Sequence, residues 1–143
     1  MTDTLYQPGI LDAVPPVARY VNFVIPDASA NAQSIKDALT RLSPLANGSD
    51  VVVGLGPSLV KAIGAQIEEL HEFPDFSREG VKVPSTPGTL WCWIRGEDLG
   101  DLLHLTRKVQ KAVAPVFAVR HVVDAFRHGW SGSDARVLSG TEV

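Results

Sequence analysis

The chain has 143 residues, 45% of them hydrophobic, which is enough for one domain with a single core. Its 13 Lys and Arg residues stand against 16 Asp and Glu without a basic run, so the charge pattern argues against a nucleic-acid partner. A single cysteine and no apolar run of about 18 residues argue against an internal disulfide, the usual zinc spacings and a membrane span, and favour a cytoplasmic protein.

Residues 1–17 predict an extended N-terminal arm, because prolines and glycines interrupt any regular element there. Arms of this kind often pack on a neighbouring subunit. A strand follows over 18–25, where apolar residues alternate with others and Pro26 ends the run. The residues that share its apolar face are Val21, Phe23 and Ile25.

The next segment predicts a helix, for which Asp27 and Ser29 are candidate caps. Its apolar residues recur at helical spacing until Ser43 and Pro44 end the pattern. Residues 51–53 are three valines in a row, which is typical of a short buried strand. The glycines that follow this strand predict a tight turn.

Pro57 is a favourable first residue for a second helix, and the apolar stripe that begins there continues to Leu70. We therefore expect a short helix in this stretch. Residues 71–88 form a connection that is long for a compact domain, which indicates an interface segment or a surface excursion.

The last three predicted elements are a strand over 90–95, a helix over 97–113 and a strand over 116–126. In the first of these strands, Leu90, Cys92 and Ile94 alternate with large residues that include Trp91 and Trp93. We therefore expect one face of the sheet to pack on helices and the other to present aromatic side chains.

This order of elements predicts an α+β protein with the ferredoxin-like split βαβ fold, a four-stranded antiparallel sheet with its helices on one face. Residues 1–17 are the arm, 18–128 the ferredoxin-like domain and 129–143 a tail. The chain shows no internal repeat, so we expect one such domain.

Four segments, in order along the chain, resemble the N-terminal half of the dye-decolourising (DyP-type) haem peroxidases. They are Tyr6-Gln7-Pro8-Gly9-Ile10-Leu11, Leu90-Trp91-Cys92-Trp93-Ile94-Arg95-Gly96-Glu97, Val123-Asp124-Ala125-Phe126-Arg127-His128 and the tail from Asp134 to Val143. The tail is similar to the approach to the family's G-x-x-D-G motif. With Gly140 as the first glycine of the motif, Val143 falls at the Asp position, and in the alternative register Ser139 does; neither supplies the acid.

The resemblance implies two ferredoxin-like halves with facing sheets in a complete family member, haem b bound in the second half, and oxidation of dyes and phenolic compounds by hydrogen peroxide. The family's distal Asp and Arg and its proximal His have no counterpart in this sequence. We therefore name no catalytic, cofactor-binding or metal residue, and expect the isolated chain to bind little haem. An encapsulating shell is implied as a partner only for a complete family member.

The four histidines are the remaining candidates for iron ligands, because an imidazole in a dry pocket can hold haem. They are His71, His104, His121 and His128. His71 opens the long connection, whereas the other three are the fallback ligands. A solvated or structural histidine is the favoured interpretation for each, and Arg127 beside His128 is interpreted as structural too.

Other motifs also favour structural roles. The pairs Glu68-Glu69 and Glu97-Asp98 are adjacent on predicted helices, where neighbouring side chains diverge, and the second pair suits a helix start. Gly54-Leu55-Gly56 lacks the further residues of a phosphate-binding loop. Cys92 lies in mid-strand, where a thiol is normally inert.

We expect a homo-oligomer, because an open sheet face that carries Trp91 and Trp93 would be covered by self-association. We also expect Leu138 to anchor the tail, with residues 140–143 mobile. The alternative to a peroxidase half is a stand-alone, non-catalytic ferredoxin-like module that dimerises or binds a small ligand. The DNA downstream of Val143 would discriminate between these two hypotheses.

Overall fold

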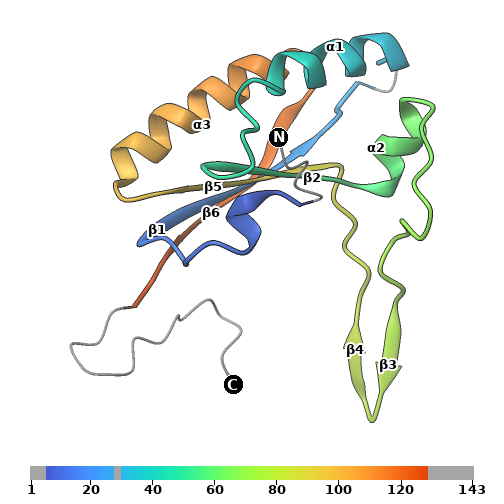
Figure 1. Cartoon of the computed structure of the whole chain (residues 1–143). Helices are drawn as coiled ribbons and strands as arrows, with labels where there is room; N and C mark the ends of the chain where they lie inside the picture. Colours follow the sequence, from blue (N-terminus) through green and yellow to red (C-terminus); the bar gives the residue numbers. More distant parts are fainter. Residues whose placement is uncertain (1–5, 28–29, 129–143) are drawn as a thin grey trace.

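The computed structural model of the chain describes residues 6–27 and 30–128, which form one layer of helices on a β-sheet (Figure 1). The sheet has four strands in the order β2-β5-β1-β6, and each neighbouring pair is antiparallel. Its strands are β1 (Val17–Val24), β2 (Val51–Leu55), β5 (Leu90–Gly96) and β6 (Ala118–Phe126). The helices α1 (Ala32–Leu42) and α3 (Leu99–Val113) cover one face. The predicted ferredoxin-like fold is confirmed.

The core lies between this helical layer and the sheet. Alternate residues of the central strands point into it, as the period of two in a strand requires. The sheet contributes Val21, Phe23, Val51, Leu90, Cys92 and Ile94, and the two helices contribute Ile35, Ala38, Leu42, Leu102, Val109 and Val113. All of these side chains are buried, which confirms the predicted apolar faces of the two central strands except at Ile25. Ile25 lies beyond the end of β1 and is only partly buried against the core.

Within the described residues, the outer strand β6 pairs only with β1, and this pairing contains an irregularity. Val21 lies opposite Val122 and Asn22 opposite His121, but Phe23 lies opposite Val119. The register therefore skips Arg120, which is the extra residue of a β-bulge. Most of β6 is exposed, because no further strand of the described chain covers its outer edge.

The predicted short second helix is present, but the apolar stripe that indicated it extends beyond its end. The helix α2 (Pro57–Ala62) has only six residues, and Gly64 has a φ of 75°, which a right-handed helix cannot accommodate. Ile67 and Leu70, which fitted the helical spacing in the sequence, are exposed in the connection that follows.

The long connection over 71–88 contains a hairpin that the sequence analysis missed. The strands β3 (Phe76–Arg78) and β4 (Val81–Val83) form a separate two-stranded sheet that projects away from the domain (Figure 1). Glu79 and Gly80 make the turn with φ angles of 51° and 83°. Positive φ at both central residues is the signature of the tight hairpin turn that matches strand twist.

The helix caps differ in part from the prediction. The cap of α1 is Asn31 and not Asp27, because the Asn31 side-chain oxygen accepts a hydrogen bond from the Ser34 backbone N–H at 2.9 Å. Ser29, the other predicted cap, lies outside the described residues. Asp98 caps α3 by accepting from the backbone N–H groups of Gly100 and Asp101 at 2.7 and 3.2 Å. Asp98, the second residue of the acidic pair Glu97-Asp98, therefore supplies the acceptor for free N–H groups at the start of α3.

The capping role of Asp98 predicts an asymmetry between these adjacent acids. Asp98→Ala should lower the free energy of unfolding by about 1 kcal/mol, because two N–H groups at the start of α3 lose their acceptor. Glu97→Ala is the matched control and should change it by less than about 0.5 kcal/mol. Urea denaturation followed by circular dichroism measures both. Equal effects of the two substitutions would contradict the assignment of the cap.

Candidate functional site

The sheet face opposite the helices carries a compact aromatic cluster, which consists of Tyr20, Trp91 and Trp93 together with Arg95. Tyr20 lies directly across from Trp93, and its ring stacks on Trp91 with centroids 5.7 Å apart and planes within 12°. The Tyr20 and Trp93 centroids are 6.0 Å apart, and the Arg95 guanidinium lies 4.6 Å from the Trp93 ring centroid. The prediction that the two tryptophans share the face away from the helices is confirmed.

The N-terminal arm covers part of this face and packs on its own domain. Its short 3-10 helix η1 (Pro8–Ile10) lies beside the sheet (Figure 1). The Gln7 side chain binds the outer edge of β2 at both backbone groups of Val53, donating to the carbonyl and accepting from the N–H at 2.8 Å each. Gly9 N–H donates to the Gly48 carbonyl at 2.6 Å. The Gln7-Pro8-Gly9 segment thus attaches the arm to the edge of β2 and to the loop at Gly48.

Arg95 joins the arm to the aromatic cluster. Its side chain is only 7% exposed and donates from Nη2 to the Ala13 carbonyl at 2.7 Å. The carboxylate of Asp12 lies 3.9 Å from Nη1. Its Nε and the Trp93 indole N–H have no acceptor among the described residues. Burying a cation is unfavourable unless it is paired, so the arm carbonyl, Asp12 and the Trp93 ring together offset that cost.

The end of β6 is also tied to the arm. Arg127 donates its backbone N–H to the Pro16 carbonyl at 2.8 Å and its Nη1 to the Val14 carbonyl at 3.0 Å. Three residues before Arg127, Asp124 of β6 forms a bidentate ion pair with Arg19 of β1, with N···O distances of 2.6 and 2.9 Å. Hydrogen bonding from Arg19 holds the pKa of Asp124 below its usual range. The segment that resembles the family's active-site approach thus makes structural contacts.

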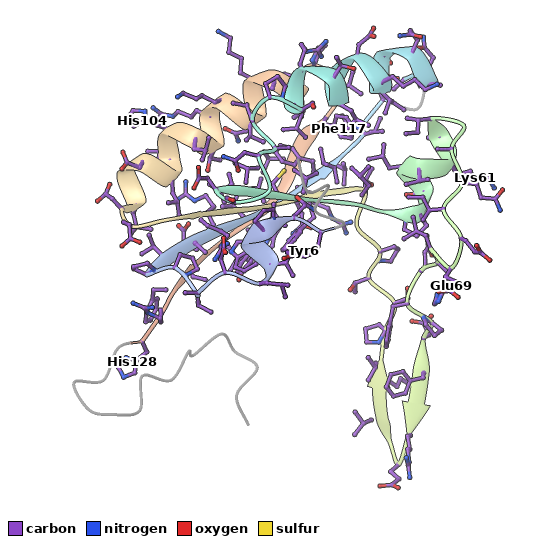
Figure 2. All side chains as sticks on the ribbon, viewed as in Figure 1. Tyr6, Lys61, Glu69, His104, Phe117 and His128 are labelled. Atoms are coloured by element: carbon purple, nitrogen blue, oxygen red, sulfur yellow. The ribbon has the colours of Figure 1, made fainter. Side chains whose placement is uncertain are left out.

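The four histidines are exposed and come from different elements. His71 precedes the hairpin, and His121 lies on the same sheet face as the aromatic cluster, opposite Asn22. Figure 2 shows His104 on the outside of α3 and His128 beyond the end of β6. No group of three or more His, Cys, Asp or Glu residues within 6–27 and 30–128 is placed to hold a metal ion.

The other candidates occupy structural positions. Burial raises the pKa of the Cys92 thiol to about 12, so its reactive thiolate is not populated at neutral pH. Gly56 caps α2, and a Cβ there would lie 1.8 Å from the Gly88 carbonyl oxygen, so a close backbone approach requires this glycine. Glu68 and Glu69 lie beyond the end of α2, contrary to the prediction that they belong to a helix.

The tail candidates, including Leu138, Ser139, Gly140 and Val143, lie outside the described residues. Within the part that is described, no helix has both the length and the apolar content needed to cross a membrane.

Comparison with known proteins identifies the family. The sequence profile of the Dyp-type peroxidase N-terminal domain matches residues 7–127. The chain therefore belongs to the DyP-type peroxidase family, as its N-terminal domain. A search of curated protein sequences finds no match.

Three solved structures illustrate the likeness of fold. The dye-decolourising peroxidase of Bacteroides thetaiotaomicron is 16% identical with a TM-score of 0.66, over 82% of this chain and 42% of that chain. A variant of Rhodococcus jostii RHA1 DypB in complex with haem is 21% identical with a TM-score of 0.67, over 83% and 42%. The encapsulated peroxidase of Mycobacterium smegmatis is 20% identical with a TM-score of 0.67, over 86% and 42%. The chain thus spans less than half the length of these relatives.

The arm contacts predict a specific effect of Gly9→Ala. A Cβ at this position would lie 2.4 Å from Arg95 Nη1 and 2.8 Å from two backbone carbonyl oxygens, which cannot move away cheaply. The substitution should release the arm, remove the Gln7 acceptor from the Val53 N–H and speed hydrogen exchange at that amide. The control is Gly88→Ala, whose Cβ would make only an ordinary contact at 3.7 Å. Unchanged protection of Val53 in the Gly9 variant would show that the arm is not held at this residue.

Proposed function

We propose that this chain forms the N-terminal half of a DyP-type haem peroxidase, whose complete form uses hydrogen peroxide to oxidise dyes and phenolic compounds. The observation that carries this proposal is the family match across residues 7–127. It is supported by the shared fold with a relative in complex with haem. The proposal includes a cytoplasmic location, which agrees with a lone cysteine, and a shell partner only for the complete protein.

The described residues do not fit a haem site. An axial ligand needs an imidazole in an apolar cavity that excludes water, whereas the four histidines are solvent-exposed and dispersed. Haem, when bound in the complete protein, would supply the chemistry with peroxide, and residues beyond this described part would hold it. The proposed contribution of this chain is structural.

That structural contribution lies in the sheet face. The arm occupies the side of β2 and β5, where Gln7 and Arg95 hold it. Tyr20 and Val123 lie on the neighbouring strands β1 and β6 and remain partly or largely exposed on the same face. A facing domain would bury this remaining apolar strip, as in the two-half arrangement that the family implies.

The first test of the proposal is haem binding and turnover. Titration of haemin into the purified chain should give no stoichiometric Soret shift, and dye oxidation with peroxide should not exceed that of free haemin. The complete protein, purified from its source with this chain in place, should show a Soret band and oxidise the dye.

The outcome that contradicts the proposal is also specific. A stoichiometric Soret shift by the isolated chain that is lost in His121→Ala or His128→Ala, with turnover above free haemin, would make this domain a haem site in its own right. His104→Ala, on the helical side, is the control for a change in histidine content.

A second candidate function, a self-associating non-catalytic module, is favoured by the exposed surface of β6. In the part of the chain that the structure describes, this strand has one partner strand, and Val122, Val123 and Phe126 are 40%, 42% and 66% exposed. An open strand edge with apolar side chains is a template for pairing with a second chain. We propose a homodimer that covers this strand and the adjoining sheet face.

The dimer proposal predicts a mass of two chains by light scattering at micromolar concentration. Val123→Lys should shift the equilibrium toward monomer, because a charge would have to be buried in the contact. Leu103→Lys on α3 is the matched control, since that side chain is 39% exposed on the opposite side. Val123 is a better site than Trp91 or Trp93, whose rings also support Tyr20 within the domain. A monomer throughout this concentration range would reject the dimer.

A further inference from the structure

A pocket of about 680 Å³ lies where β1, β6 and the segment 85–89 meet. It is separate from the described part of the arm, because none of its lining residues belongs to residues 6–17. The side chains with hydrogen-bonding groups that line it are Asn22, Ser85, Thr86, Thr89, Arg120 and His121. Three segments that are distant in sequence therefore contribute polar groups to one pocket.

The β-bulge explains why two adjacent residues of β6 reach the same pocket. Neighbouring side chains in a regular strand point to opposite faces of the sheet. The pairing of β6 with β1 skips Arg120, which stands between the positions opposite Asn22 and Phe23. Arg120 and His121 therefore both line the pocket, although they are consecutive. Bulges often redirect a side chain toward a functional site.

The opposite wall is fixed by backbone contacts. Gly56 N–H donates to the Thr89 carbonyl at 2.8 Å, and the closeness of Gly56 to the Gly88 carbonyl leaves no room for a side chain. At the other end of the segment, the Asp75 carboxylate accepts a hydrogen bond from the Ser85 backbone N–H. The hydroxyl groups of this wall are thus held on an anchored segment.

The charge of the pocket is distinctive in a chain with a net charge of −3. Among the residues that the structure describes, its lining includes an arginine and a histidine but no Asp or Glu. Asp75, which anchors the wall, is not a lining residue. Within the described chain, the Arg120 guanidinium has neither an ion pair nor a hydrogen bond, in contrast to Arg19, which is fully engaged by Asp124.

We propose that this pocket binds an oxyanion, the phosphate or carboxylate group of a small molecule. Arg120 supplies the charge and a planar fork of donors that matches two oxygens of such a group. The Asn22 amide, the His121 ring and the hydroxyls of Ser85, Thr86 and Thr89 supply further donors around it. An oxyanion can accept hydrogen bonds from all of these groups, and no carboxylate of the described lining would repel it.

The test is an NMR titration of the ¹⁵N-labelled chain with inorganic phosphate and, separately, with acetate, at constant ionic strength maintained with sodium chloride. At least one anion should produce saturable shifts at the amides of Asn22, Arg120, His121 and 85–89. The anion that saturates at the lower concentration identifies phosphate or carboxylate as the preferred group.

Arg120→Gln should weaken the binding about tenfold or more, which is the loss expected for one charge-assisted hydrogen bond. Arg107→Gln removes the same charge from the exposed side of α3 and should change the affinity less than about twofold. Both positions are exposed, so the amide spectra should show that the variants remain folded. Shifts that do not saturate, that lie elsewhere, or that weaken equally in both variants would overturn the proposal.

Discussion

The antiparallel pairing of β1 with β5 determines both faces of this domain. With Val21 opposite Cys92, the buried residues of the two strands meet under α1 and α3, and with Tyr20 opposite Trp93, the aromatic residues meet on the other side. Because side chains alternate along a strand, a slip of one residue would exchange the two sets. The core, the aromatic cluster and the docking of the arm on Arg95 all depend on this one register.

The arm determines which part of the sheet face opposite the helices is covered. It brings backbone carbonyls to a buried arginine and closes part of the edge of β2, so one side of the face is held by the arm while the side of Tyr20 and Val123 stays partly or largely exposed. A domain of this kind holds its own structure together while it retains a surface for a neighbour. In the function proposed above, the contribution of this domain is architectural, and haem would be held by other parts of the complete protein.

The sequence predicted the elements with strong periodicity and missed those that depend on local backbone geometry. The strand at 90–95 and the helix to Val113 were found because their apolar spacing is regular. The apolar stripe after Pro57 continues beyond the helix, since Ile67 matches the helical spacing but Gly64 breaks the backbone. The aromatic face was predicted, whereas the Gln7 and Arg95 contacts and the bulge at Arg120 were not. Hydrogen bonds to distant carbonyls leave no periodic signal.

The ion pair between Arg19 and Asp124 spans a separation of 105 residues, and it joins strands that neighbour each other in the sheet. A growing chain that has made β1 must therefore wait until β6 has been synthesised before the sheet can be completed. Until then one edge of β1 stays unpaired and its polar backbone is open to other strands. Closing so long a loop slows folding, so this edge is exposed to pairing with other chains for longer than the edge of a hairpin formed by neighbouring strands would be.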